Sequence, residues 1–148
     1  MEKNSKKKDV IVEIKGYFRD DNSVDSAEVS AKGVFMQTPN VFTLLYDECS
    51  MQDNRVTKTM VQVWGEEKVV ISRMGNAPSQ LIMEKGKRHL CQYGTEYGSC
   101  LMGVSTQAIQ SDLTDNGGRL YFKYMLDANA SKISENEVTI QIRECPNE

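Results

Sequence analysis

Apolar and polar residues alternate along most of the chain, and this alternation predicts β-strands. Val10, Val12 and Ile14 share one face of residues 10–18, and charged side chains occupy the other face. A period of two is typical of a strand that buries one of its faces. Residues 119–127 repeat the pattern, and no long stretch has the 3.6-residue period of a helix.

Breaks that contain glycine, proline or acidic residues divide the pattern into about ten short strands. The expected strands span residues 10–18, 30–37, 41–49, 56–64, 68–74, 80–84, 89–93, 104–113, 119–127 and 137–143. Residues 19–29 are predicted to form a loop, because they are rich in acidic and turn-forming residues. Residues 114–118 contain Asn-Gly-Gly and give the strongest turn signal, because asparagine and glycine tolerate positive φ.

Short strands joined by tight turns indicate an all-β protein with a single domain. We expect one antiparallel, mostly up-and-down β-barrel of about 8–10 strands, in which neighbours along the chain pair throughout. A sandwich is the alternative, but pairing the first strand with the last removes exposed edges. The barrel is expected to span residues 10–148, after a flexible basic tail at residues 1–9.

Composition excludes several classes of protein. The 148 residues are 39% hydrophobic and carry a net charge of -3, which argues against a disordered chain and against a general nucleic-acid binder. No apolar run approaches the ~18 residues of a membrane helix, and the N-terminus lacks the apolar stretch of a secretory signal. We therefore expect a cytoplasmic protein that does not bind membranes.

Cysteine and histidine usage argues against a metal site. The four cysteines, Cys49, Cys91, Cys100 and Cys145, are widely spaced, and His89 is the single histidine. A zinc site built from closely spaced ligand pairs is not expected, and in a reducing compartment the cysteines remain free thiols. No sequence motif indicates a cofactor, and no phosphate-binding or catalytic motif is present.

Three stretches of the chain resemble a known family. Residues 81–89, residues 93–98 and the glycine-rich hairpin at residues 112–124 are similar to the YwiB-like family of small bacterial proteins. The likeness spans roughly residues 9–143. It implies a lipocalin-like (calycin-like) β-barrel, and it implies no reaction and no ligand, since the function of that family is uncharacterised.

Arg73 is the main candidate for ligand binding. It shares a strand face with Val69 and Ile71, so its guanidinium is expected to point into the barrel, where a buried cation needs a partner. It could bind the carboxylate or phosphate of a ligand. An internal salt bridge, or a side chain that extends to solvent at the rim of the barrel, is the favoured alternative.

Aromatic residues on the predicted strands complete the set of candidates. The side chains that could line a lumen, besides Arg73, are Trp64, His89, Tyr93, Tyr97, Phe122 and Tyr124. The aromatic residues among them would also fill an ordinary barrel core. His89 shares a strand face with Cys91 and Tyr93 and could act as a base, but a hydrogen-bonded structural histidine is favoured.

Three functions are consistent with these observations. The first is a module that binds a small apolar or amphipathic molecule in the lumen, which requires a cavity of at least ~300 Å³. The second is a structural barrel with a filled core that acts through its outer face, as a homodimer or with a protein partner. An enzyme that uses His89 with a cysteine or tyrosine is the least supported, because no catalytic signature is present.

Overall fold

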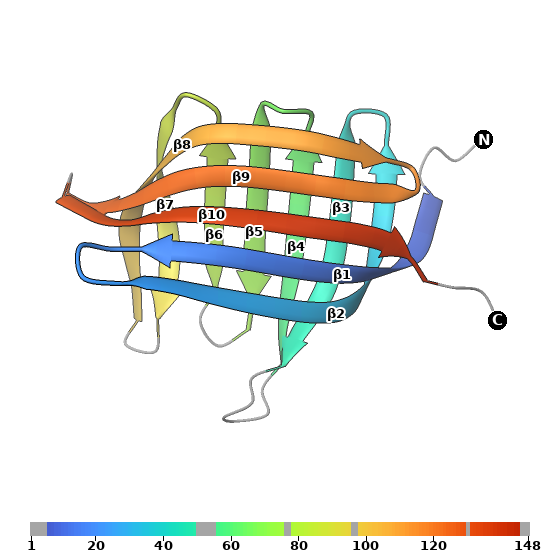
Figure 1. The fold of residues 1–148 in the computed structure, drawn as a ribbon, viewed down its shortest axis with the longest axis horizontal. Helices are drawn as coiled ribbons and strands as arrows, with labels where there is room; N and C mark the ends of the chain where they lie inside the picture. Colours follow the sequence, from blue (N-terminus) through green and yellow to red (C-terminus); the bar gives the residue numbers. More distant parts are fainter. Residues whose placement is uncertain (1–5, 50–55, 76–77, 96–97, 130, 146–148) are drawn as a thin grey trace.

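The computed structural model describes residues 6–49, 56–75, 78–95, 98–129 and 131–145, and all ten elements in these residues are strands. The strands are β1 (Lys6–Arg19), β2 (Val24–Thr38), β3 (Val41–Cys49), β4 (Val56–Trp64), β5 (Lys68–Met74), β6 (Ser79–Glu84), β7 (Arg88–Thr95), β8 (Gly98–Thr114), β9 (Gly117–Ala128) and β10 (Ser131–Glu144). Strands β1, β2, β8, β9 and β10 run across Figure 1, and β3 to β7 cross behind them.

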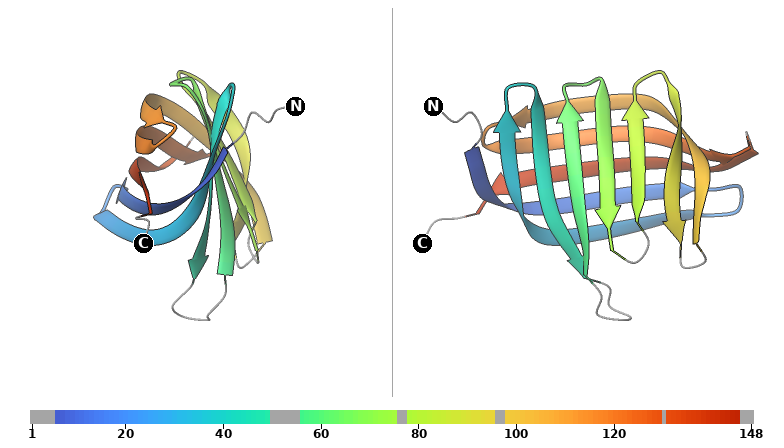
Figure 2. Two further views of the ribbon diagram at one scale, coloured as in Figure 1. Left: turned by 90° about the vertical axis from the view of Figure 1, so that its right-hand side faces the viewer. Right: turned by 180° about the vertical axis from the view of Figure 1, so that it is seen from behind.

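One antiparallel sheet contains all ten strands, in the order β6-β5-β4-β3-β2-β1-β10-β9-β8-β7. The first and last strands pair along their length, from Val10 opposite Glu144 to Arg19 opposite Glu135. The sheet curls, so that β3–β7 form one layer and β1, β2 and β8–β10 form the other (Figure 2). The prediction of an all-β antiparallel barrel is confirmed.

The barrel is nearly closed, and its seam lies between β6 and β7. In the part of the chain that the structure describes, no backbone ladder joins these two strands, although they are consecutive. The amide of Ile82 donates instead to the Cys91 sulfur at 3.3 Å, and the amide of Gly86 donates to the Thr106 carbonyl on β8 at 3.0 Å. The prediction that neighbours pair throughout is therefore wrong at this one connection.

The first two strands are longer than the sequence predicted. Strand β1 begins at Lys6 and pairs with β2, so residues 6–9 belong to the barrel and not to the expected tail. Residues 1–5 lie outside the described residues. Strand β2 begins at Val24, because pairing with β1 outweighs the polar character of residues 24–29. The loop expected at residues 19–29 is reduced to a turn in which Asp20 accepts two backbone hydrogen bonds.

The core fills one end of the barrel. The rings of Phe35 and Phe42 stack with centroids 5.4 Å apart, and Leu120 and Phe122 are buried in the same core cluster. The void beside Phe35, Phe42 and Leu120 is about 10 Å³, which is too small for a ligand. This end of the barrel is therefore solid.

We expect Gly118→Ala to destabilise the barrel more than Gly65→Ala does. Both glycines have positive φ, 134° at Gly118 and 56° at Gly65, which costs an alanine about 1 kcal/mol. A methyl group on Gly118 would also collide with the Asp112 carbonyl, whereas nothing lies within 4 Å at Gly65. Urea unfolding should show a loss of about 3 kcal/mol for Gly118→Ala. Equal losses for the two variants would contradict the tight β8–β9 turn.

Candidate functional site

A cavity of about 270 Å³ occupies the other end of the barrel, between the two layers of strands. Its walls are mostly apolar, and among the side chains that form them are Ile14, Val61, Ile71, Leu126, Val138 and Ile140. These six side chains come from five strands, which belong to both layers. The cavity is therefore a product of closure and belongs to no single hairpin.

Small side chains on the inner face of the first hairpin make this space. Gly16 and Ala27 occupy inward positions that bulky side chains would otherwise fill. A methyl group on Gly16 would lie 2.7 Å from the ring of Phe18, so the glycine also makes room for this ring. Val29 lines the cavity and is still 37% exposed, which shows that the cavity opens to solvent near β2.

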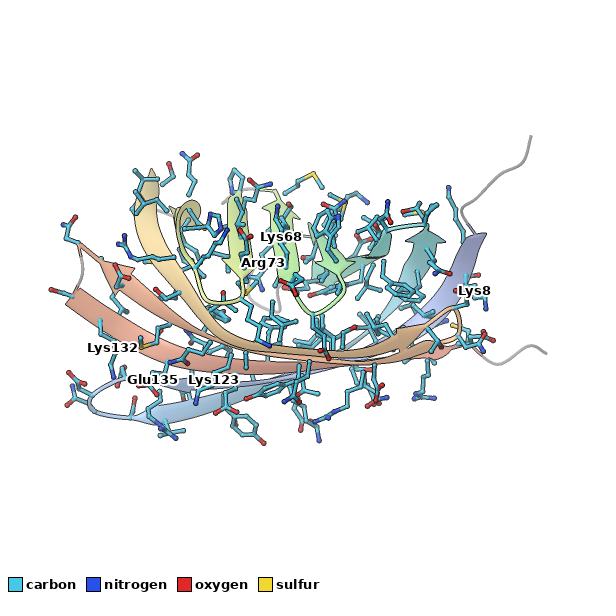
Figure 3. All side chains as sticks on the ribbon, turned by 90° about the horizontal axis from the view of Figure 1, so that it is seen from above. Lys8, Lys68, Arg73, Lys123, Lys132 and Glu135 are labelled. Carbon is cyan, nitrogen blue, oxygen red and sulfur yellow. The ribbon has the colours of Figure 1, made fainter. Side chains whose placement is uncertain are left out.

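A row of polar side chains crosses the cavity wall on strands β3, β4 and β5. Tyr46 lies opposite Thr59, and Thr59 lies opposite Arg73. The Arg73 Nε is buried without a hydrogen-bond partner among the described residues. In Figure 3 Arg73 lies between the layers of strands. The cavity wall thus contains a polar atom, the Arg73 Nε, that the described residues leave unsatisfied.

The two phenols that flank this region stay protonated at neutral pH. The Tyr46 hydroxyl donates to the Glu48 carboxylate at 3.0 Å, and burial raises the pKa of Tyr46 well above its usual range. Burial also raises the pKa of Tyr124 to about 12. Both side chains line the cavity, so the Tyr124 hydroxyl is available there as a hydrogen-bond donor.

The opposite layer presents a second set of polar groups. Asn136 on β10 lies opposite Tyr124 on β9 and is only 3% exposed. Its amide nitrogen donates to the Ser134 hydroxyl at 3.1 Å. Asn136 lines the same cavity as Arg73 and Tyr124, so polar groups from both layers converge on one space.

The structure brings together three of the side chains that the sequence singled out. Arg73, Tyr93 and Tyr124 all line the cavity. Phe122 is fully buried beside Tyr124, with ring centroids 6.0 Å apart, and contributes to the packed core. It does not line the cavity.

The other candidates lie apart from the cavity. Trp64 follows the inward-facing Val63 and so faces outward, where the Lys68 ammonium lies 5.2 Å from the centre of its ring. The expectation that Trp64 lines the lumen does not fit this position. His89 is half-buried and forms a 2.9 Å contact with Glu84, whose pKa this contact lowers. Tyr97 lies outside the described residues.

Three polar residues of the cavity were not identified from the sequence. Tyr46 and Glu48 alternate with outward residues on β3, and this period of two could have placed them on the inner face with Leu44. Asn136 lies in a polar segment that showed no strand pattern, so the sequence offered no comparable signal for it.

The described residues contain no group of three or more histidine, cysteine, aspartate or glutamate side chains that could hold a metal ion. They also contain no helix that is long and apolar enough to cross a membrane.

Comparisons with known proteins identify the family but no activity. The family described as a domain of unknown function, DUF1934, matches residues 12–140. The chain belongs to this family. The DUF1934 chain is 25% identical over 132 residues to the "Uncharacterized beta-barrel protein YwiB" of Bacillus subtilis (strain 168), covering 88% of this chain and 90% of that protein. The expected resemblance to the YwiB-like family is confirmed.

A solved structure shares the fold of this DUF1934 domain. The crystal structure of the ywiB protein from Bacillus subtilis superimposes with a TM-score of 0.83 at 24% sequence identity. The match covers 97% of this chain and 96% of that chain, so the likeness extends over the whole barrel.

We expect the Cys91 thiol to react slowly with iodoacetamide. Cys91 is 3% exposed, and burial raises the pKa of its thiol, whereas Cys100 is exposed. Mass spectrometry of the alkylated protein at neutral pH should show that Cys100 is modified before Cys91. The substitution His89→Gln should leave the alkylation rate of Cys91 unchanged. Faster labelling of Cys91 that depends on His89 would instead support a nucleophile and base pair.

The stability of the barrel should fall as the pH rises above about 10. Between the ordinary tyrosine pKa of 10.0 and the value of about 12 for Tyr124, the unfolded chain releases this proton and the folded protein retains it. Urea unfolding near neutral pH and at about pH 11 should show this loss, and Tyr124→Phe should reduce it by about 1 kcal/mol. An identical loss in the variant would show that Tyr124 titrates normally.

Proposed function

We propose that the protein is a cytoplasmic barrel that binds a small apolar or amphipathic molecule in its cavity. The observation that carries this proposal is the convergence of Arg73, Tyr124 and Asn136 on a space with mostly apolar walls. Ligand sites generally combine apolar walls with a few polar groups that orient the ligand. The free thiols of Cys91, Cys100 and Cys145 fit a reducing compartment.

The size of the cavity limits the ligand to a compact molecule. A volume of 270 Å³ is slightly below the ~300–1,000 Å³ that is typical of ligand sites. It is the space of about nine water molecules at ~30 Å³ each. The exposed Val29 at the opening provides a route of entry from the side of the β1–β2 hairpin.

Filling the cavity should abolish binding without unfolding the barrel. Val138 projects into the cavity from β10, opposite Gly16 on β1, so a larger ring can be accommodated there. With hexan-1-ol as the probe, saturation-transfer NMR should show binding to the wild type and none to Val138→Phe. The matched control is Val56→Phe, since Val56 is 54% exposed and does not line the cavity. Equal binding by all three proteins would overturn the proposal.

Native mass spectrometry of the purified protein tests for a ligand retained from the cell. A mass excess that disappears on denaturation, and that is absent from Val138→Phe, would support the proposal. A mass excess that persists in Val138→Phe would place the bound molecule elsewhere and count against it.

The alternative is a barrel that acts through its outer face. The observation in its favour is the exposure of Leu90 and Leu101, which are 62% and 65% exposed on neighbouring strands β7 and β8. Both line an outer groove of about 550 Å³ beside the seam. This alternative requires no ligand in the lumen, so the absence of hexan-1-ol binding would favour it.

A further inference from the structure

Arg73 is an unusual component of an apolar cavity wall. Its Nε is buried and has no hydrogen-bond partner among the described residues. A buried donor without a partner costs about 1–3 kcal/mol. None of the ion pairs within 4 Å that the structure shows between described residues includes Arg73. The fold therefore maintains a guanidinium at this position whose Nε has no partner among the described residues.

The surroundings of Arg73 indicate what could serve as that partner. Arg73 lines both the cavity and the outer groove at the seam, so this residue lies where the two spaces approach each other. A charged group beside it would keep partial access to water, which limits the desolvation cost. The Tyr124 phenol is a protonated donor, and Arg73 is close enough to Tyr124 to influence its pKa.

We propose that the cavity binds a monocarboxylic acid with a compact apolar body, and that Arg73 holds its carboxylate. The Nε–H and one terminal N–H of a guanidinium match the two oxygens of a carboxylate, so side-on binding would satisfy the buried Nε. The Tyr124 hydroxyl supplies a further donor, and the apolar body extends toward Val138 and Ile140. This inference rests on the proposed function and names the chemical class of its ligand.

The charges of the cavity favour a carboxylate over a phosphate. Of the described side chains that line it, Arg73 is the single cation and Glu48 is an anion. The Glu48 carboxylate accepts the hydrogen bond of Tyr46 and forms no ion pair with Arg73 within 4 Å. The Arg73 guanidinium can pair with one negative charge, and Glu48, as a second anion at the cavity, disfavours a ligand that carries more than one. A phosphate dianion would require further cations.

The test compares hexanoate with its neutral isostere hexanamide by isothermal titration calorimetry at neutral pH. The wild type should bind hexanoate about tenfold more tightly than hexanamide, because a charged bidentate contact is worth at least 1.4 kcal/mol. Arg73→Met should weaken hexanoate binding about tenfold and leave hexanamide binding nearly unchanged. Arg73→Lys should give an intermediate result, since lysine keeps the charge and loses the bidentate geometry.

Lys68→Met is the matched control. It removes the same charge from the same strand, but Lys68 lies on the outer face over Trp64. Lys68 and Arg73 are both labelled in Figure 3. Lys68→Met should bind both probes as the wild type does. Weaker hexanoate binding in this variant would mean that net charge, and not the Arg73 contact, attracts the acid, and would overturn the inference.

The stability of the unliganded variant separates a ligand-binding role from a structural one. Without ligand, Arg73→Met should unfold at a urea concentration equal to or higher than the wild type, because it removes a buried donor that has no partner. A clear loss of stability would show that Arg73 supports the barrel and would contradict the inference.

The outcomes distinguish this inference from the proposed function. If hexanamide and hexan-1-ol bind as tightly as hexanoate, the cavity is a ligand site, but the assignment of a carboxylic acid as its ligand is wrong. Tighter binding of hexyl phosphate than of hexanoate would also overturn the carboxylate assignment. If none of the probes binds, the proposed function itself fails.

Discussion

The pairing of β1 with β10 is the interaction on which the rest of the structure depends. Because β1 also pairs with β2, it joins strands β2–β6 and β7–β10 into one sheet. Separation of β1 from β10 would expose two strand edges and an apolar face on each half. The continuous register from Val10 to Arg19 instead keeps all ten strands in one sheet, which curls so that β3–β7 cross behind β1, β2 and β8–β10 (Figure 1). All interior features, including the cavity, exist because the inner faces of these two layers meet.

Once the sheet is closed, the sizes of the inward side chains decide which part of the interior is solid. Phe35, Phe42 and Phe122 fill one end, whereas Gly16 and Ala27 leave space at the other. A protein interior normally packs without voids larger than a water molecule. A barrel with a purely structural role could place larger residues at these positions. The combination of a tightly packed end and an open end is what separates this interior from a uniform core.

The open end combines features that are unfavourable for stability alone. The buried Arg73 Nε has no partner among the described residues, although native proteins satisfy most buried polar atoms. Arg73 lies on the wall of the cavity. Binding sites commonly keep polar groups that only the ligand satisfies, since this is how they select it. The same groups therefore explain both the cost to the fold and the capacity to recognise a polar head group.

The sequence by itself determined the strands, the principal turn at residues 114–118 and the inward face of Arg73, because alternation and turn chemistry are local properties. The sequence did not predict the part of β2 before residue 30, where pairing with β1 outweighs the local polarity of the chain. It also could not distinguish Trp64, Phe122 and Tyr124, which are all aromatic residues on strands. The tertiary structure places the first outside, the second in the packed core and the third at the cavity. Only the closed barrel decides this, because the space around each side chain depends on the residues that the opposite layer brings against it.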